Sequence, residues 1–263
     1  MDEKNPARKP ERSTLKSGAK RLGGAVLNIL YPPRCLSCGK PDQAAHPDHS
    51  ELCVRCKEQL ALLLPPFCSR CGESYSGNLT ATGFSCGNCA NRSYAFDFAI
   101  ASYEATGLAR DLVHRFKYQR EFHLRVVLGA LLEPALNDLR IADEDDWLMV
   151  PVPLHPRRRR EREFNQAAEI SRIAARQFGI EYLDALKRTR YTTHQAHLDR
   201  RDRLETLRGA FAMKNERLAK RLPGQKVLLI DDVFTTGATP HECAAVLRTQ
   251  GVAKVAAVTI ARG

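Results

Sequence analysis

Two adjacent carboxylates, followed by small and hydroxylated residues, form the part of the chain whose residue types best suit ligand chemistry. The segment VLLIDDVFTTGAT, residues 227–239, is an apolar run that reaches Asp231 and Asp232. Five small or hydroxylated residues follow shortly after: Thr235, Thr236, Gly237, Ala238 and Thr239. Such residues let the backbone approach a ligand, and N–H groups at the start of a helix favour a phosphate. Carboxylates repel a phosphate but accept hydrogen bonds from vicinal ribose hydroxyls, so the segment predicts a ribose 5-phosphate site.

Other nucleotide-binding patterns do not occur in the sequence. A nucleotide hydrolase would need a GxxxxGK[ST] loop, and a dinucleotide site would need GxGxxG after its first strand. The chain contains neither pattern. The remaining alternative is a plain strand, turn and helix in which the two acids are incidental.

Eight of the nine cysteines form an internal repeat. Four CxxC pairs occur, at Cys35 and Cys38, Cys53 and Cys56, Cys68 and Cys71, and Cys86 and Cys89. Each cysteine of the second half lies 33 positions after its counterpart in the first. Four thiolates complete the tetrahedral coordination of a zinc ion and leave no position for water, so the repeat predicts two structural zinc sites. Sequential pairing of the CxxC units follows from the repeat, and interleaved pairing is the alternative.

Other interpretations of the cysteines are disulfide-stapled loops or a redox-active CxxC, for which the spacing is too regular. His46 and His49 lie between the first two pairs and could replace a cysteine as ligand, although exposed loop histidines are the simpler interpretation. Cys243 falls on an expected helix, where we predict a small buried apolar side chain.

The elements that must position the two acids follow the last CxxC pair. Strands are expected at FDFAIASYEATG, DDWLMVPVPL, KVLLIDD and KVAAVTIAR, and helices at residues 108–136, at FNQAAEISRIAARQF and from about residue 240 to 250. This alternation predicts an α/β fold with a mainly parallel sheet flanked by helices. Ligands of such sheets bind at the carboxyl ends of strands, which is where Asp231 and Asp232 are expected.

The composition favours an anionic partner. The chain has 41 Lys and Arg against 30 Asp and Glu, a formal charge of +11, which suits nucleic acid, phosphorylated metabolites or acidic lipid. No apolar stretch approaches the roughly 20 residues of a membrane helix, so we expect no membrane span. Residues 1–21 are polar and basic and are expected to be a disordered tail. Thiol-rich zinc sites suit a reducing compartment, so the expected location is cytoplasmic.

Four segments, taken in order, resemble the ComF family of competence-associated proteins. VLLIDDVFTTGAT resembles the binding signature for phosphoribosyl pyrophosphate (PRPP) of the type I phosphoribosyltransferases. It is preceded by the cysteine repeat, by VPVPLHPRRRREREFNQA and by KRTRYTTHQAHLDRRDRLETLRGAF. Members of the family join a cysteine-rich zinc module to such a domain. The resemblance implies a double zinc-ribbon module at residues 22–94 and a type I phosphoribosyltransferase-like domain at residues 95–263.

Position by position, the resemblance implies that Asp231 and Asp232 bind the ribose diol and that residues 235–239 form the 5-phosphate loop. Of the arginines after VPVPL, we select Arg157 and Arg158 as contacts for pyrophosphate oxygens. The region from Gln195 to Arg203 resembles the mobile loop that covers the substrate in amidotransferase relatives. 

The chain departs from the family pattern at two positions. Glu163 stands where glycine usually precedes FNQ, and Thr206 stands where asparagine usually precedes LRGAF. Both positions adjoin segments that the resemblance assigns to the ligand site. The first departure concerns a turn, so we expect its effect on the backbone there.

The resemblance implies transfer of a phosphoribosyl group from PRPP, with bound Mg²⁺, to an unknown acceptor, and a link to DNA uptake in natural transformation. Thr235 stands where purine-salvage relatives often have aspartate, which argues against purine salvage. No catalytic residue is assigned. The alternative is a non-catalytic nucleic-acid adaptor, or a sensor of PRPP or nucleotides, with single-stranded DNA and other competence proteins as partners.

Overall fold

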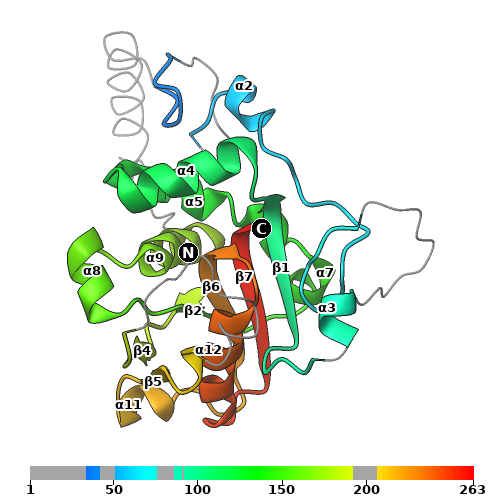
Figure 1. The fold of residues 1–263 in the computed structure, drawn as a ribbon, viewed down its shortest axis with the longest axis vertical. Helices are drawn as coiled ribbons and strands as arrows, with labels where there is room; N and C mark the ends of the chain where they lie inside the picture. The colour runs from blue at the N-terminus through cyan, green and yellow to red at the C-terminus, as the bar shows by residue number, and fades with distance from the viewer. Residues whose placement is uncertain (1–33, 42–50, 76–85, 91, 192–205) are drawn as a thin grey trace, which may run out of the picture.

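A five-stranded parallel sheet is the centre of the fold (Figure 1). The computed structural model describes residues 34–41, 51–75, 86–90, 92–191 and 206–263. The strands are β1 (Phe98–Glu104), β2 (Trp147–Pro151), β3 (Glu181–Tyr182), β6 (Lys226–Phe234) and β7 (Lys254–Arg262), in the spatial order β1-β7-β6-β2-β3. A separate antiparallel pair consists of β4 (Leu186–Arg188) and β5 (Phe211–Met213). The prediction of a mainly parallel sheet is confirmed.

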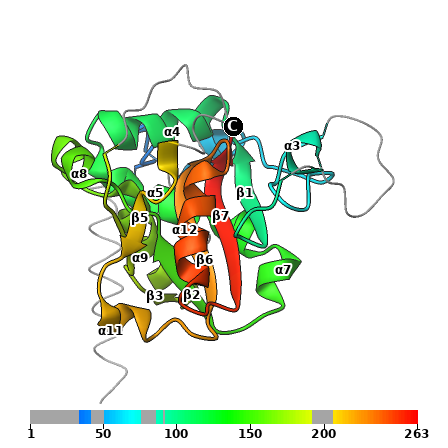
Figure 2. The same ribbon diagram turned by 60° about the horizontal axis from the view of Figure 1, so that its bottom comes forward.

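Helices cover both faces of this sheet (Figure 2). One face packs against α4 (Gly107–Tyr118), α5 (Arg125–Ala130), α6 (Glu133–Leu136) and α9 (Gln166–Phe178). The other face packs against α12 (Ala238–Arg248). The remaining helices of the described residues are short: α2 (Val54–Lys57), α3 (Gly87–Ala90), η1 (Phe122–Leu124), α7 (Leu139–Ala142), α8 (Pro156–Arg162) and α11 (Glu216–Ala219). Burial on both faces explains why the central strands read as uninterrupted apolar runs.

Strand β6 lies in the middle of the sheet, between β7 and β2. Its residues 227–230 are fully buried and alternate between the two apolar cores. Asp231 and Asp232 come next, still within the strand and near its carboxyl end. The strand therefore carries both acids to the edge of the sheet where ligands of α/β folds bind.

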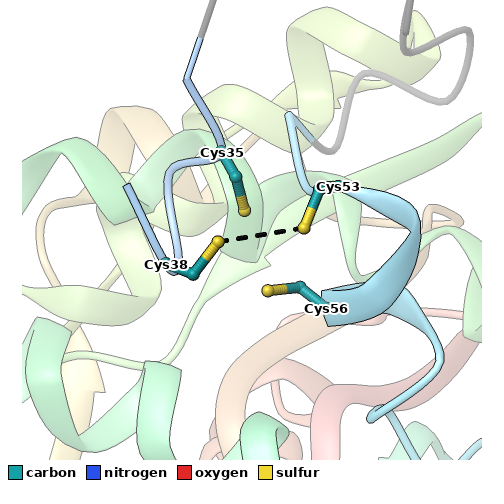
Figure 3. Close-up of side chains that lie close together, drawn as sticks. All are labelled: Cys35, Cys38, Cys53 and Cys56. Carbon is teal, nitrogen blue, oxygen red and sulfur yellow. Dashed lines mark hydrogen bonds between the residues drawn. The ribbon is translucent and has the colours of Figure 1, made fainter. Parts of the chain in front are cut away.

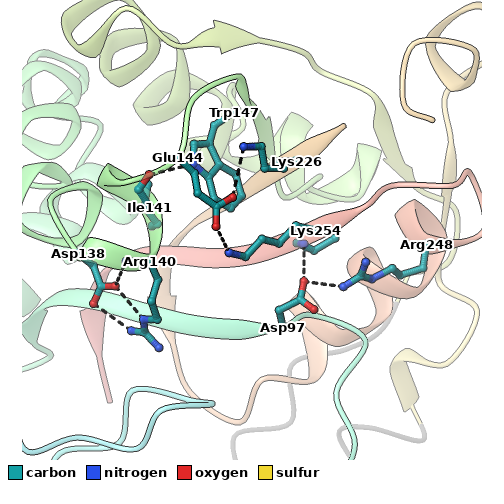
Figure 4. Close-up of polar contacts among 10 residues, drawn as sticks. Asp97, Asp138, Arg140, Ile141, Glu144, Trp147, Lys226, Arg248 and Lys254 are labelled. Carbon is teal, nitrogen blue, oxygen red and sulfur yellow. Dashed lines mark hydrogen bonds and ion pairs between the residues drawn. The ribbon is translucent and has the colours of Figure 1, made fainter. Parts of the chain in front are cut away.

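A network of ion pairs lies at the opposite, amino-terminal edge of the sheet (Figure 4). Glu144, before β2, contacts Lys226 Nζ at 3.3 Å and also pairs with Lys254, so one carboxylate joins the first residues of β6 and β7. Asp97, before β1, accepts a hydrogen bond of 2.5 Å from Arg248 Nη2 of α12. Single exposed ion pairs contribute little to stability. As a group, these pairs tie together the starts of three neighbouring strands, far from the two acids.

The cysteine-rich segment packs directly on the sheet and its helices. Cys35 and Cys56 lie in the same apolar core as α4 and β1. The four later cysteines lie in the second core, together with Tyr94 and Phe96. The module therefore shares its buried surface with the sheet, and the expected boundary between residues 94 and 95 stays a prediction.

The single helical pattern expected over residues 108–136 is interrupted. Helix α4 ends at Tyr118 and α5 begins at Arg125. Between them Arg120 has a φ of 59°, and a left-handed residue cannot continue a right-handed helix. Helix α12 also begins slightly earlier than expected, at Ala238, so part of the small-residue segment forms its first turn.

Some expectations concern residues outside the described ranges. These are the tail at 1–21, His46 and His49, and the covering loop from Gln195 to Arg203. Among the helices that the structure does describe, none combines the length and apolar character needed to cross a membrane.

Candidate functional site

A cavity of about 250 Å³ opens at the carboxyl end of β6. Its walls come from the end of α4, the loop after β2, the start of α9, strand β4 and the loop between β6 and α12. Besides Asp231 and Asp232, five basic side chains line it: Lys117, His155, Arg158, Arg162 and Arg188. A smaller hollow of about 40 Å³ lies within the β6–α12 loop and is lined by residues 233–240 and Asp231. The excess of basic groups suits a ligand with several negative charges.

Asp231 and Asp232 have different surroundings. The Asp232 side chain is only 5% exposed, and its Oδ1 accepts a hydrogen bond of 2.7 Å from Lys117 Nζ. Its Oδ2 is buried and has no donor within the described part of the chain. Asp231 Oδ1 accepts a hydrogen bond from the backbone N–H of Asp232 at 2.9 Å. The pair therefore retains free acceptor capacity on both carboxylates.

Burial raises the pKa of Asp231 to about 7. That value already includes the charge of Asp232, which also raises the pKa, and the positive charge of Lys117, which lowers it. An aspartate that is held partly protonated near neutral pH costs the fold free energy when it ionises. Perturbed carboxylates of this kind are typical of ligand sites.

The loop between β6 and α12 is built around Gly237. Gly237 has a φ of 78°, and a Cβ there would lie 2.9 Å from Phe234 Cζ, so only glycine fits. The N–H of Ala238 is directed to Thr236 Oγ1 at 3.4 Å. Within the described residues, the backbone N–H groups of Thr235, Thr236 and Gly237 have no protein acceptor. These donors lie at the start of α12, where the helix dipole favours an anion.

The arginines after β2 divide into those that line the cavity and those that do not. Arg158 and Arg162, both on α8, line it. Arg157 does not, because its Nε contacts Glu161 Oε1 at 3.3 Å and its guanidinium lies 4.7 Å from the ring centre of Tyr191. Arg158 thus shares the cavity lining with the two acids, whereas Arg157 packs on Tyr191, another residue of the lining, without lining the cavity itself.

His155 caps the amino end of α8, and its pKa is lowered by its surroundings. Its Nδ1 accepts a hydrogen bond of 3.2 Å from the N–H of Arg157. Desolvation lowers the pKa of His155, and the positive charges of Arg188, Arg160 and Arg157 lower it further. The positive charges that contribute to this lowered pKa would favour a bound polyanion.

Glu163, one of the two departures from the family pattern, ends α8 in a left-handed conformation with a φ of 73°. Left-handed positions after a helix favour glycine, because a Cβ costs about 1 kcal/mol there. The residue thus occupies a backbone position that suits the usual glycine. Its side chain lies 3.1 Å from Arg120, and both are well exposed.

The variant Glu163→Gly is expected to raise the free energy of unfolding by about 0.5–1 kcal/mol, since relief of the strained φ exceeds the value of one exposed ion pair. Chemical denaturation monitored by circular dichroism measures this. The matched control is Glu161→Gly, inside the same helix, which should destabilise by about 1 kcal/mol. A loss of stability in Glu163→Gly would contradict the strain at this turn.

The eight repeated cysteines form two separate sets, as sequential pairing predicts. Figure 3 shows the first set, Cys35, Cys38, Cys53 and Cys56. The ligand atoms of each set all lie within 4.8 Å of one another. Cys38 Sγ and Cys53 Sγ are 3.8 Å apart, and Cys71 Sγ and Cys86 Sγ are 3.6 Å apart. A tetrahedral zinc ion with Zn–S bonds of about 2.3 Å places its sulfur ligands about 3.8 Å apart. Both sets therefore fit zinc in geometry and in ligand chemistry.

The first cysteine of each set has a lowered pKa, which favours its thiolate form. Desolvation by burial raises the pKa of Cys35, but backbone N–H groups near Cys38 and Cys53 outweigh it and bring the pKa to about 7. The same balance brings the pKa of Cys68 to about 7, and the N–H of Cys86 lies 3.3 Å from its sulfur. Such N–H contacts are the usual support of metal-bound thiolates.

Lys117 and Arg188 are residues of the cavity that the sequence analysis does not identify. Lys117 follows the buried Val113 by one helical turn, so it lies next to the buried face of α4. A lysine at such a position in the sequence indicates a side chain that pairs with an acidic group. Arg188 is in a short strand, and burial lowers its pKa. No local pattern distinguishes Arg188 from the many exposed arginines of this chain.

Family models match the chain in two segments. The double zinc ribbon domain matches residues 26–90, and the phosphoribosyl transferase domain matches residues 165–263. Together with the two cysteine sets and the mainly parallel sheet, these matches define a zinc-ribbon protein with a phosphoribosyltransferase domain.

Relatives similar over most of the chain give the family. Competence protein F of Haemophilus influenzae is 31% identical over 235 residues, which is 87% of this chain and 96% of the relative. The DNA utilization protein YhgH of Salmonella typhimurium is 29% identical over 233 residues, 86% of this chain and 96% of the relative. The chain belongs to the ComF family of competence proteins.

Among solved structures, the chain is similar to the allosteric regulatory enzyme of purine biosynthesis, with a TM-score of 0.32 and 19% sequence identity. The match covers 51% of this chain and 24% of that one. A likeness at this level carries no information on activity.

Proposed function

We propose that the cavity at the end of β6 binds PRPP. The ribose hydroxyls would donate to Asp231 and Asp232, and the 5-phosphate would accept hydrogen bonds from the N–H groups of residues 235–239. The observation that carries this proposal is a buried acceptor without a donor, Asp232 Oδ2, in a cavity also lined by Thr235 and Thr236, whose backbone N–H groups have no acceptor within the described residues. An unsatisfied buried group such as Asp232 Oδ2 costs about 1–3 kcal/mol, which a ribose hydroxyl would offset.

The pyrophosphate of PRPP would lie toward α8 and β4. Arg158, Arg162 and Arg188 line that side of the cavity and are the best-placed cations, whereas Arg157 lies outside it. Mg²⁺ would be held mainly by oxygens of PRPP, with Asp231 and Asp232 near enough in the lining to support it through water. The metal would neutralise charge on the pyrophosphate leaving group.

Transfer of the phosphoribosyl group to an acceptor is the reaction that this site would support. The chain's own residues would position the ribose and the pyrophosphate while the acceptor displaces pyrophosphate from the anomeric carbon. The names of the relatives, competence protein and DNA utilization protein, support a role connected with DNA uptake. Reduced cysteines in both zinc sites agree with the cytoplasmic location that we propose.

A thermal shift tests the binding proposal. PRPP with Mg²⁺ at about 100 times its Kd should stabilise the chain by about 2.7 kcal/mol, and for a domain of this size the melting temperature should rise by about 5–10 °C. Ribose 5-phosphate should give a smaller rise, because it lacks the pyrophosphate. The absence of any shift at millimolar PRPP would contradict the proposal.

A second candidate role is that of a nucleic-acid adaptor. It is favoured by the net charge of +11 and by Tyr118, which is 59% exposed at the cavity rim with Arg162 stacked 4.9 Å from its ring centre. Exposed aromatic rings beside arginines suit single-stranded DNA. Pyrophosphate release from PRPP with candidate acceptors would support the enzyme. Salt-sensitive binding of single-stranded DNA that survives replacement of both Asp231 and Asp232 by Asn would support the adaptor.

A further inference from the structure

Arg262, the last residue of β7, is buried between the second cysteine set and the loop that follows β6. Its Nε donates to the carbonyl of Cys71 at 3.2 Å, and its Nη2 pairs with Glu73. On the other side, its Nη1 donates to the carbonyls of Thr235 at 3.1 Å and Phe234 at 3.4 Å. Only 5% of the Arg262 side chain is exposed. One planar guanidinium therefore joins a zinc-binding knuckle to the first residues of the phosphate loop.

The carbonyls to which Arg262 donates hydrogen bonds determine where the loop directs its N–H groups. In a trans peptide unit the C=O and the N–H point in opposite directions. The carbonyls of Phe234 and Thr235 both face Arg262, and the carbonyl of Phe234 also accepts a hydrogen bond of 2.9 Å from the N–H of Gly263. The N–H groups of Thr235 and Thr236 therefore point away from Arg262. These are two of the donors that have no acceptor within the described residues. Arg262 thus orients phosphate-binding groups without touching the cavity itself.

Tyr94 holds the next peptide unit in the same way. Its hydroxyl donates to the carbonyl of Thr236 at 3.3 Å, which turns the N–H of Gly237 to the opposite side. The Tyr94 ring stacks on Phe96 at 4.6 Å and lies beneath Gly237, where a Cβ would come within 3.1 Å of it. Tyr94 follows Cys89, the last ligand of the second set, by five residues. Three successive peptide units of the loop are therefore held from behind by Arg262 and by the chain that leaves the second set.

The first cysteine set has no such connection in the described part of the chain. It packs on α4 and β1 through Cys35 and Cys56, and Arg115 on α4 adds a polar contact by donating to the carbonyl of Ser37 at 3.0 Å while it pairs with Glu121. The two cysteine sets thus contact different parts of the phosphoribosyltransferase-like domain. One packs against α4, and the other lies behind the phosphate loop.

We propose that the second cysteine set, once it holds zinc, positions the phosphate loop through Arg262, so that tight binding of the 5-phosphate depends on this set more than on the first. Arg262 is then a positioning residue, because it acts on the ligand only through the carbonyls of Phe234 and Thr235. The planar guanidinium suits this role, because it can donate hydrogen bonds to the cysteine segment on one side and to the loop carbonyls on the other at the same time. The proposal rests on the assignment of residues 235–239 as the 5-phosphate site.

The test compares two ligands in calorimetric titrations of the full, zinc-loaded chain. Ribose 5-phosphate reports on the loop, and pyrophosphate with Mg²⁺ reports on the arginines of the opposite wall. Arg262→Gln should weaken ribose 5-phosphate binding about tenfold or more, as expected for loss of a charged hydrogen-bond network, and should change pyrophosphate binding less than about twofold. Arg262→Lys keeps the charge but not the fork and should fall between wild type and Arg262→Gln.

Arg140→Lys is the matched control. Arg140 Nη1 donates to the carbonyl of Ser69 at 2.8 Å, so it also contacts the second ribbon, but it does not reach the loop. Arg140→Lys should leave both affinities within about twofold of wild type, whereas a merely structural role of Arg262 would lower both affinities together. Should Arg262→Gln fail to retain two zinc ions and its fold, Tyr94→Phe, which removes the hydroxyl that contacts Thr236, should still weaken ribose 5-phosphate about threefold.

The outcomes separate this inference from the proposed function. If wild type binds neither ribose 5-phosphate nor PRPP, the proposed function is wrong. If wild type binds ribose 5-phosphate and the folded Arg262 and Tyr94 variants bind it equally well, the positioning role is overturned. Equal weakening of ribose 5-phosphate and pyrophosphate would overturn it as well.

Discussion

The variant Asp231→Asn is expected to be more stable than wild type at pH 8 and to lose most of its affinity for PRPP. Burial and the charge of Asp232 raise the pKa of Asp231 to about 7, so the folded chain holds a proton that the unfolded chain releases near pH 4. Stability is therefore highest below pH 4 with respect to this group, and it falls as the pH rises to about 7. The upper bound of this loss is about 4 kcal/mol, and partial exposure of Asp231 reduces the expected value to about 2 kcal/mol.

Asparagine removes the cost of ionisation but keeps an oxygen for the backbone N–H of Asp232. Unfolding in urea at pH 4 and pH 8 measures the effect: the variant should gain about 2 kcal/mol over wild type at pH 8 and close to none at pH 4. Asp232→Asn is the matched control with the opposite sign. It leaves Lys117, whose side chain is 17% exposed, without its charged partner and should lose about 1–2 kcal/mol.

Both variants should bind PRPP at least about 30-fold more weakly, because each removes a charged acceptor from the ribose diol. For wild type, PRPP affinity should rise with pH as Asp231 ionises around pH 7, and Asp231→Asn should lose that part of the pH dependence. A stability gain at pH 8 combined with a loss of binding is the signature of a residue kept for function. Wild-type affinity for PRPP in Asp231→Asn would contradict its role at the diol.

Removal of zinc is expected to have the largest effect on stability. Structural zinc sites contribute about 10 kcal/mol or more of apparent binding free energy each, and this is coupled to folding. Here six of the eight ligand cysteines are buried, and both sets contribute to the apolar cores that support the sheet. Loss of the metal should therefore unfold more than the two ribbons.

Elemental analysis of the purified chain should give two zinc ions, and dialysis against a strong chelator should lower the melting temperature by more than about 10 °C or abolish the cooperative transition. Cys243→Ala is the control, since Cys243 is buried but lies outside both sets, and it should keep two zinc ions. A metal-free chain with an unchanged transition would contradict a structural role of zinc.

Local patterns were sufficient to predict the features that depend on spacing along the chain. The CxxC repeat predicted two sets of four cysteines, and the sequential pairing is confirmed. The apolar run before Asp231 and Asp232 predicted a central buried strand, because only a strand covered on both faces is apolar at every position. In both cases the spacing of residues within one segment determines the local structure of that segment.

Local sequence patterns could not predict the contacts between segments that lie far apart in the chain. Lys117 reaches Asp232 only because α4 packs on the face of the sheet that Asp232 faces, 115 positions along the chain. Arg262 lies in the last strand and contacts Cys71 across 191 positions, so no pattern near either residue indicates the other. The choice between Arg157 and Arg158 depends on one helical step of 100° in α8, which the run of arginines leaves undetermined.

The most direct test of the central claim, that the end of β6 binds a phosphorylated ribose, is a calorimetric titration of the zinc-loaded chain with PRPP and Mg²⁺. We expect saturable binding at one site per chain, which is lost when Asp231 and Asp232 are both replaced by Asn. No binding by wild type at millimolar PRPP, or unchanged binding by the double variant, would contradict the account.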